Sequence, residues 1–389
     1  MMALPEDAAK DRSPVLTYAP PRPPAAAPDD SALVCPPPGP RYPLFKRRVP
    51  ERLFYLVPAL MWLALAIRHG SLTLPSAANP AMEAGGLWGE SKSQGLDLFG
   101  PQGRRCIARF ARVTCGPDAE ATARAALGAM AAERLNFPVV AKPDRGYQGW
   151  GVRLIRDRAD LADYLRLQPE GALVLLQKLI EFQGEAGIFY IRRPGEAQGR
   201  IVSMALVYPP HVTGDGTHTV AQLVAADNIL APNAAIYRER HPEDWNRILP
   251  KGQFHRLTNA RSARLGAVYV DALDQVTPAL SRAIDEISRE IPDFHFGRFD
   301  IRFDSPQALR EGRGFCIVEL NGAGAEMLHI WAGSGRLMDA WRTLWRQYRA
   351  LFGIGAEMRR RGHRPVGLRG MIRLQRAQEK LRRVYPPSS

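Results

Sequence analysis

The sequence has few cysteines and few lysines, and its longest apolar run is too short to cross a bilayer comfortably. The four cysteines, Cys35, Cys106, Cys115 and Cys316, show no CxxC spacing, which excludes the usual zinc pattern and a disulfide framework. Only seven of the 53 basic residues are lysine, and 46 are arginine. Lysine positions are therefore informative. No arrangement of Ser, His and Asp, or of Cys and His, indicates a covalent nucleophile.

The remaining composition describes a globular chain with an unusual start. Of its 389 residues, 46% are hydrophobic and 24% charged, which is ordinary for a protein that buries a sizeable core. The first 50 residues hold 13 of the 33 prolines, so we expect a largely disordered Pro-rich tail. A net charge of +14 would ordinarily suggest nucleic acid. No nucleic-acid module is recognisable, so we expect no such partner.

Two short stretches near residue 300 carry the strongest chemical signal. Residues 297–301 read Gly-Arg-Phe-Asp-Ile, and residues 315–322 read Phe-Cys-Ile-Val-Glu-Leu-Asn-Gly. Both predict strands, and side chains two apart on a strand share a face. One face then carries Arg298, Asp300, Glu319 and Asn321. Magnesium prefers such hard oxygens, and a guanidinium suits a transferring phosphoryl group. A water-facing hairpin is the alternative, but a charge within Cys-Ile-Val-Glu-Leu would be costly to bury.

These motifs resemble the metal-binding core of the ATP-grasp superfamily, most closely the D-alanine–D-alanine ligase-like carboxylate–amine ligases. The resemblance implies an α+β fold in which two α+β lobes clamp ATP. It assigns Asp300, Glu319 and Asn321 to two Mg²⁺ ions, with Mn²⁺ as the alternative ion, and Arg298 to the transferred phosphate. It covers roughly residues 88–335 of the chain.

A lysine and a glycine-rich turn upstream form a second part of the expected site. Residues 137–142 predict an apolar strand that ends at Lys142, and the turn that follows contains Gly146, Gln148 and Gly149. Glycines let the backbone approach phosphates closely, while an ammonium group neutralises their charge. Glycine-rich hairpins are common, but beside the magnesium motif this one resembles the ATP-grasp phosphate loop.

Lys92 lies fifty residues before Lys142, close to the separation between the family's two phosphate-contacting lysines. An ordinary lysine at a helix start is the alternative. Because lysine is so scarce in this chain, we favour the functional role.

A buried-looking strand at residues 172–180 resembles the interdomain hinge of the family, whose backbone contacts adenine. The resemblance places Lys178 and Ile180 beside the adenine and assigns the ribose hydroxyls to Glu185. Many relatives have glutamate where Gln177 stands. This departure affects the side-chain part of adenine recognition and leaves the backbone part intact.

Residues 213–222, Thr-Gly-Asp-Gly-Thr-His-Thr-Val-Ala-Gln, resemble a segment of cyanophycin-synthetase-like ATP-grasp domains. An Asp-Gly turn here leads into a capping box formed by Thr219 and Gln222. We favour this structural explanation over a catalytic one.

Residues 53–67 are continuously apolar and include Pro58. At 15 residues the run is short for a membrane span, so we favour a buried helix, with an interfacial membrane helix as the alternative. Basic residues at 46–48 and in a predicted helix at 371–384 are explained first as solvated faces. Contact with an acidic membrane surface is the alternative explanation.

The coarse layout has five segments. They are a disordered tail (1–50), a short lead-in with an apolar helix (51–91), a smaller lobe (92–183), a larger lobe with the metal site (184–352) and a basic C-terminal helix or tail (353–389). D-alanine–D-alanine ligases usually carry a complete α/β domain before the first lysine, which 41 residues cannot form. Because that domain helps bind substrate, the substrate cannot be transferred by analogy.

The expected function is therefore an ATP-dependent ligase that activates a carboxylate as an acyl phosphate and couples it to an amine. Small-molecule carboxylates and amines would be its partners, and its place would be the cytoplasm, with the periphery of the inner membrane as the alternative. A kinase that phosphorylates a small acceptor and a nucleotide-binding non-enzyme are the other hypotheses. His329 beyond the second metal strand either faces substrate or lies in the core.

Overall fold

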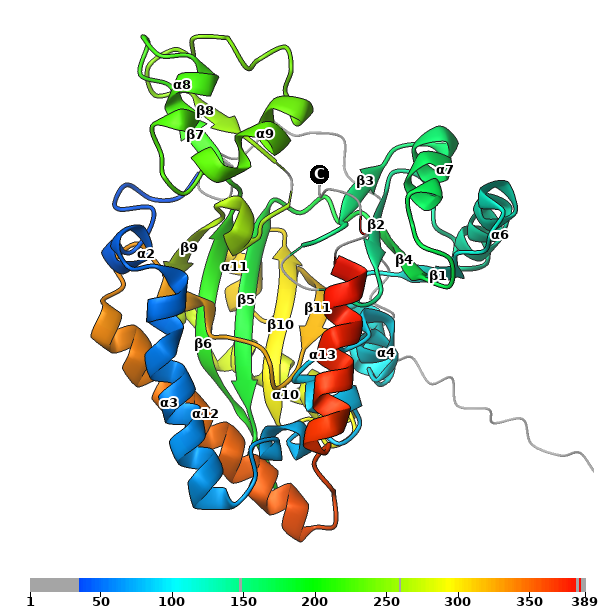
Figure 1. Cartoon of the computed structure of the whole chain (residues 1–389), viewed down its shortest axis with the longest axis vertical. Helices are drawn as coiled ribbons and strands as arrows, with labels where there is room; N and C mark the ends of the chain where they lie inside the picture. The colour runs from blue at the N-terminus through cyan, green and yellow to red at the C-terminus, as the bar shows by residue number, and fades with distance from the viewer. Residues whose placement is uncertain (1–34, 147–148, 259, 383–384, 386–389) are drawn as a thin grey trace, which may run out of the picture.

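The computed structural model describes residues 35–146, 149–258, 260–382 and 385. Two α+β lobes, each built on an antiparallel sheet, form the body of the molecule, and a small subdomain stands above the larger one (Figure 1). The expected two-lobed α+β architecture is confirmed. The predicted disorder of residues 1–34 lies outside the described residues.

The smaller lobe is a four-stranded sheet in the order β1-β4-β2-β3. Its elements are β1 (Phe110–Thr114), α6 (Ala119–Ala132), β2 (Val139–Pro143), β3 (Arg153–Ile155), α7 (Arg158–Arg166) and β4 (Leu173–Lys178). Asp118 and Asp157 cap the two helices by accepting hydrogen bonds from backbone N–H groups of the first turn. Side chains from the strands and from both helices, including Val139 and Tyr164, form the buried core of this lobe.

The larger lobe contains a five-stranded sheet in the order β11-β10-β5-β6-β9. The strands are β5 (Gly184–Ile191), β6 (Arg200–Tyr208), β9 (Val268–Asp271), β10 (Phe296–Phe303) and β11 (Phe315–Asn321). Helix α10 (Pro278–Glu290) packs on one face against Phe299 and Ile301. Because side chains alternate along β10, Arg298 and Asp300 point to the opposite face.

The remaining helices of the larger lobe are α4 (Lys92–Asp97), α5 (Pro101–Cys106), α11 (Pro306–Arg310) and α12 (Leu337–Arg360). Helices α4 and α5 contact β11, so the larger lobe includes part of the segment assigned to the smaller one. The predicted boundary at residue 352 falls inside α12. A separate helix, α13 (Leu368–Arg382), follows where a C-terminal basic helix was expected.

A small subdomain is inserted between β6 and β9. It contains β7 (His211–Thr213), α8 (Val220–Ala225), α9 (Ala234–Arg240) and β8 (Phe254–Arg256), with its own buried cluster. The predicted capping box is present, with Thr219 accepting from the backbone of Gln222 and the Gln222 side chain accepting from the backbone of Thr219. The predicted larger lobe, residues 184–352, included this subdomain without a boundary.

Residues 35–50 correct the expected extent of the disordered tail. Helix α2 (Leu44–Arg48) lies here, and the Tyr42 hydroxyl donates a hydrogen bond to the Gly266 carbonyl at 2.7 Å. Phe45 stacks on Phe54 with ring centroids 5.3 Å apart. The prolines of this stretch are therefore compatible with an ordered segment, because aromatic side chains between them reach the larger lobe.

Residues 53–67 form most of helix α3 (Glu51–His69), which packs beside α12. The prediction that this helix is buried is wrong: only 22% of its apolar window is buried. By length and composition it is the one helix in the described part of the chain that could cross a membrane. Short 3₁₀ turns complete the fold at Leu74–Ala77, Glu83–Gly86, Ala231–Asn233, Ala263–Leu265, Leu273–Gln275 and Leu328–Trp331.

Candidate active site

The two predicted metal strands are neighbours in the larger sheet. Strand β10 pairs with β11 in antiparallel register, with Asp300 opposite Glu319 and Arg298 opposite Asn321. Directly opposed residues lie on the same face of a sheet. The four side chains predicted to share a face are therefore brought together.

Asp300 is the centre of a hydrogen-bonded group on this face. Arg298 donates from Nε to one carboxylate oxygen at 2.6 Å and from a terminal nitrogen to the other at 3.0 Å. Asn321 Nδ2 donates to Asp300 at 2.9 Å, which leaves its amide oxygen able to act as an acceptor or ligand. The other terminal nitrogen of Arg298 donates to the backbone carbonyl of Glu326 at 3.0 Å. The guanidinium is thus held in one orientation.

Glu319 faces cations from both lobes. Its carboxylate lies 3.4 Å from the Lys92 ammonium group. Burial alone would raise the pKa of Glu319, but the charges of Lys92, Lys142 and Arg298 hold that pKa below its usual value. The carboxylate therefore stays ionised at neutral pH, as a metal ligand must.

Lys142 reaches from β2 of the smaller lobe to β11 of the larger one. Its ammonium group donates to the Val318 carbonyl at 3.1 Å, and Gln177 donates to the same carbonyl at 3.2 Å. The lysine is buried, and burial lowers its pKa to about 8 despite the nearby Glu319. Gln177 is therefore held at the junction between the two lobes, facing β11.

Lys92 is positioned by the residues after Lys142. The backbone N–H of Lys92 donates to the Asp144 carbonyl at 3.0 Å, and the Ser93 N–H donates to the buried Asp144 carboxylate at 2.8 Å. The Lys92 ammonium group donates to the Gly146 carbonyl. The start of α4 and the glycine-rich turn therefore form one structural unit, as their proposed common role requires.

The turn itself uses two glycines in the left-handed region, Gly149 with φ +74° and Gly151 with φ +71°. A Cβ at Gly151 would also lie 2.7 Å from the Pro143 ring. Only glycine adopts this conformation readily. Gln148, which was predicted to contact nucleotide, lies outside the described residues.

Glu90 is a further carboxylate that the sequence analysis missed. It accepts a hydrogen bond from the Gly322 N–H at 3.2 Å, directly after the metal strand. Burial raises the pKa of Glu90 to about 7, although the backbone hydrogen bond and Lys92 oppose that shift. Its position two residues before Lys92 was the one available signal, because both residues enter the site on the same short segment.

The predicted hinge residues lie at the end of β4. The backbone N–H of Lys178 donates to the Arg109 carbonyl at 2.8 Å, and Ile180 is half-buried just beyond the strand. Glu185 lies at the start of β5, where its carboxylate is 3.0 Å from Arg302 and 3.5 Å from Arg261. A ribose would therefore meet a carboxylate already paired with two guanidinium groups. The adenine and ribose assignments stay predictions.

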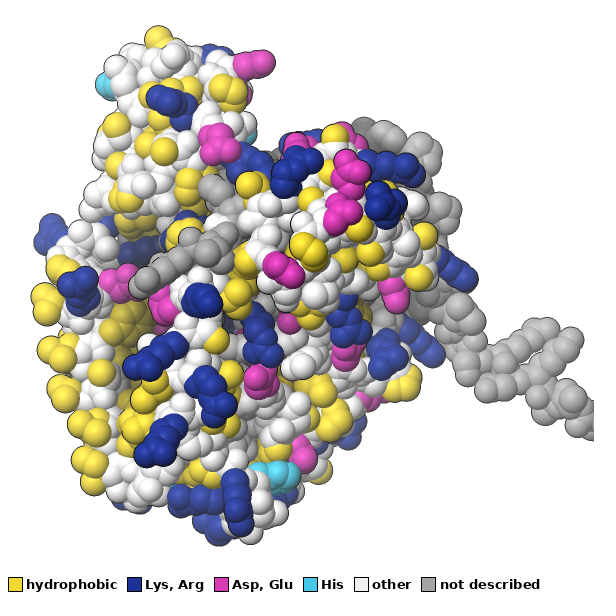
Figure 2. All heavy atoms as spheres, turned by 45° about the vertical axis from the view of Figure 1, so that its right-hand side comes forward, with side chains coloured by type: hydrophobic (Ala, Val, Ile, Leu, Met, Phe, Trp, Pro, Cys, Tyr) yellow, Lys and Arg dark blue, Asp and Glu magenta, His cyan; other side chains and the backbone are white. Residues whose placement is uncertain are grey.

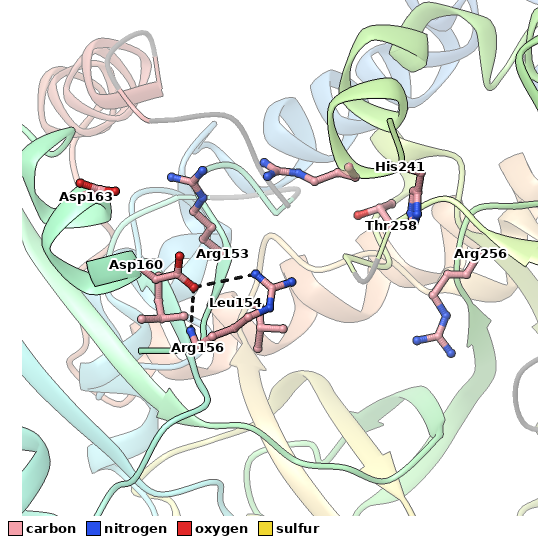
Figure 3. A pocket seen from close by; sticks show the side chains of 10 residues that line it. Arg153, Leu154, Arg156, Asp160, Asp163, His241, Arg256 and Thr258 are labelled. Atoms are coloured by element: carbon pink, nitrogen blue, oxygen red, sulfur yellow. Dashed lines mark hydrogen bonds and ion pairs between the residues drawn. The ribbon is translucent and has the colours of Figure 1, made fainter. Parts of the chain in front are cut away.

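A second feature between the smaller lobe and the inserted subdomain is a pocket of about 220 Å³ (Figure 3). Arginines line the pocket from both sides. Arg153 of β3 and Arg156 just after it belong to the smaller lobe, and Arg240 of α9 and Arg256 of β8 belong to the inserted subdomain. Asp160 lies 3.8 Å from Arg156. Burial lowers the pKa of Arg240, and Arg153 and Arg156 lower it further. The pocket therefore suits an anionic ligand.

Beside this pocket, His241, Asp244 and His255 bring possible ligand atoms within 4.8 Å of one another. Asp244 is paired with Arg247 at 3.1 Å, and His241 lines the arginine-rich pocket. This charge environment disfavours a cation. The sheet face of β10 and β11 fits magnesium better, because it offers two carboxylates and an amide oxygen.

His329 contacts β6 on the same face of the larger sheet as Arg298, because Phe189 of β5 lies between Arg298 and Ser203 in the register. Its Nδ1 is 2.7 Å from the Ser203 hydroxyl, and burial lowers the pKa of the ring. The ring is half-buried, and both explanations of His329 stay predictions.

Comparisons with known proteins give one significant sequence match. No family model matches the chain. A cyanophycin synthetase from Synechocystis is 23% identical over 219 residues, which are 51% of this chain and 24% of that protein. The chain thus spans about a quarter of the length of the curated relative it matches. The predicted resemblance to ATP-grasp enzymes is confirmed by this match.

Solved structures are also similar over part of the chain, and two of them are a glutathione synthetase and a D-Ala:D-Ser ligase. A bifunctional glutathione synthetase from Pasteurella multocida is 16% identical and covers 66% of this chain and 36% of its own, with a TM-score of 0.36. The VanG D-Ala:D-Ser ligase from Enterococcus faecalis is 14% identical, and the match covers 70% of this chain and 62% of the ligase chain, with a TM-score of 0.37.

Proposed function

We propose that this protein is an ATP-dependent carboxylate–amine ligase that works through an acyl phosphate. One observation carries the proposal: the positive charges of Lys92, Lys142 and Arg298 surround Glu319. These three residues come from separate elements of the fold. Three cations around an ionised carboxylate provide both a phosphate site and a metal ligand. A packing role alone would not require so many charges in one buried place.

Asp300, Glu319 and Asn321 would hold magnesium, which would neutralise charge on the β- and γ-phosphates during transfer. Lys92, Lys142 and the backbone of the turn that begins at Gly146 bind the remaining phosphate charge. In this scheme Lys92 would leave its contact with Glu319 for the nucleotide, and the Glu319 carboxylate would then be free to hold the metal.

The substrate carboxylate attacks the γ-phosphorus, and the bond between that phosphorus and the ADP oxygen breaks. The amine nitrogen then attacks the acyl carbon, phosphate leaves, and the nitrogen loses a proton. Arg298, fixed by Asp300 and the Glu326 carbonyl, stabilises the negative oxygen of the tetrahedral intermediate. A carboxylate with a pKa of about 7, as in Glu90, can accept the proton at neutral pH.

The arginine-rich pocket favours a substrate with negative charge beyond its reacting carboxylate. Arg153 and Arg240 line it from the smaller lobe and from the inserted subdomain. An anion between them would draw the two parts together and neutralise like charges. We assign this pocket to the non-reacting end of the carboxylate substrate. ATP use and free cysteines in the described part of the chain agree with a cytoplasmic location.

The test is a panel of carboxylates and amines with Mg-ATP, read by ADP release and mass spectrometry. A ligase gives ADP and phosphate only when both substrates are present, with a product that joins them. A kinase would give a stable phosphorylated product without an amine. Tight Mg-ATP binding without turnover across the panel would favour a non-enzyme and overturn the proposal.

A further inference from the structure

Helix α3 presents a continuous row of large aliphatic side chains to solvent. Their spacing is three and four residues in turn, which keeps them on one side of a helix. Their exposed fractions are 58% for Leu53, 55% for Leu56, 58% for Leu60, 48% for Leu63 and 74% for Ile67. We call these five residues the leucine row. In Figure 2 hydrophobic side chains follow the left edge of the molecule, where α3 lies.

The opposite side of α3 fixes the helix to the larger lobe. Phe54, Pro58 and Leu65 are buried there. The Phe54 carbonyl accepts a hydrogen bond from the Trp341 indole at 3.2 Å. The leucine row is therefore exposed on an anchored helix, and packing against its own lobe does not account for it.

The exposed positions within the row's length carry no charge. Besides the row itself, Ala59 and Ala64 are the other exposed residues between positions 53 and 67. Exposed arginines stand beyond both ends of this apolar strip: Arg48 and Arg52 before it, and Arg68, Arg359 and Arg360 after it. Arg359 is joined to the end of α3 by a hydrogen bond to the His69 carbonyl at 3.2 Å.

This charge pattern decides between two occupants. One occupant would be a second copy of the chain, with its α3 helix antiparallel to the first. The arginines at the start of one α3 helix would then face the arginines at the end of the other. The exposed strip covers on the order of 500 Å², less than the roughly 800 Å² per partner of a stable interface. An anionic surface meets both ends favourably, because the exposed arginines outnumber the acidic residues beside them, which are Glu51 before the strip and Glu357 after it.

We propose that α3 binds the surface of an anionic lipid bilayer, with the leucine row in the interface and the flanking arginines on the headgroups. A 19-residue helix is roughly 28 Å long and can lie flat in that interface. Its buried side stays on the larger lobe. The proposal does not depend on the ligase activity.

Vesicle flotation tests the proposal, because aggregated protein does not float. The full chain is mixed with phosphatidylcholine vesicles, with or without about 30% phosphatidylglycerol, at low, physiological and high salt. We expect flotation with anionic vesicles that weakens as salt rises. The triple variant Leu56→Gln, Leu60→Gln, Leu63→Gln should lose at least about tenfold in partitioning, since three apolar side chains no longer enter the interface.

A matched control changes three exposed aliphatic residues away from α3: Leu167→Gln, Ile248→Gln and Leu273→Gln, with starting exposures of 52%, 51% and 43%. This variant should float like the native chain. The proposal is overturned if the native protein remains in solution with anionic vesicles at low salt. It is also overturned if the leucine-row variant floats equally well. A concentration-dependent dimer that only the leucine-row variant abolishes, without flotation, would identify a second copy as the occupant.

Discussion

The ammonium group of Lys92 lies 3.4 Å from the carboxylate of Glu319, although the two residues come from opposite ends of the catalytic region. The contact joins the segment before the smaller lobe to the second metal strand of the larger one. It places a phosphate-binding cation and a metal-binding anion at the same point. Both groups would have to exchange partners when Mg-ATP binds.

Glu319→Gln should lower ATP hydrolysis and ligation by at least about 100-fold, because the amide keeps the shape of the side chain and removes its charge. Steady-state ADP release measures the effect, and circular dichroism checks the fold. Near-normal turnover in a folded variant would remove the magnesium assignment.

Lys142→Ala should weaken Mg-ATP binding by about 10- to 100-fold, since it deletes a charged phosphate partner. Isothermal titration calorimetry measures the affinity. The matched control is Lys380→Ala, which removes an exposed lysine of α13. If both changes have equal effects, bulk positive charge and not a site binds the nucleotide.

The affinity for Mg-ATP should be constant below pH 8 and fall as pH rises above it. Burial lowers the pKa of Lys142 to about 8 in the free protein, so the ammonium group loses its proton above that pH. Phosphates favour the charged form and raise the pKa in the complex, so affinity falls between the two pKa values. In Lys142→Arg the guanidinium stays charged. If the affinity of this variant still falls above pH 8, a group other than Lys142 causes the pH dependence.

Glu90→Gln should lower kcat and remove the decline of kcat/KM below about pH 7. The sign follows from the raised pKa: below 7 the native carboxyl is protonated and cannot accept a proton from the amine. The control, Glu133→Gln, changes an exposed residue at the end of α6 and should keep the native profile. An unchanged acid limb in Glu90→Gln would leave Glu90 with a structural role only.

Arg240→Gln should raise the KM for the carboxylate substrate by about tenfold and leave the KM for ATP unchanged, because Arg240 comes from α9 of the inserted subdomain and not from the metal strands or the glycine-rich turn. Initial rates with each substrate varied separately measure the two constants. Arg124→Gln, on the exposed face of α6, is the control. A parallel rise in both KM values would place Arg240 in nucleotide binding instead.

The local pattern of the chain was sufficient to predict the strands and their shared face. Period-two alternation places Arg298 with Asp300 and Glu319 with Asn321 whatever the rest of the molecule does, because successive side chains of a strand point to opposite sides. The scarcity of lysine singled out Lys92 and Lys142; Lys92 contacts the Glu319 carboxylate, and the charge of Lys142 lowers the pKa of the same group. These predictions needed only short-range geometry and composition.

Tertiary structure alone decided which groups meet across long separations. Helix α3 is apolar on nearly all sides, so its sequence could not indicate that Phe54 would be buried and Leu60 exposed. The same holds for Glu185, whose partners Arg261 and Arg302 lie far along the chain. Burial, pKa and charge pairing depend on neighbours brought together by packing, and a local pattern does not contain those neighbours.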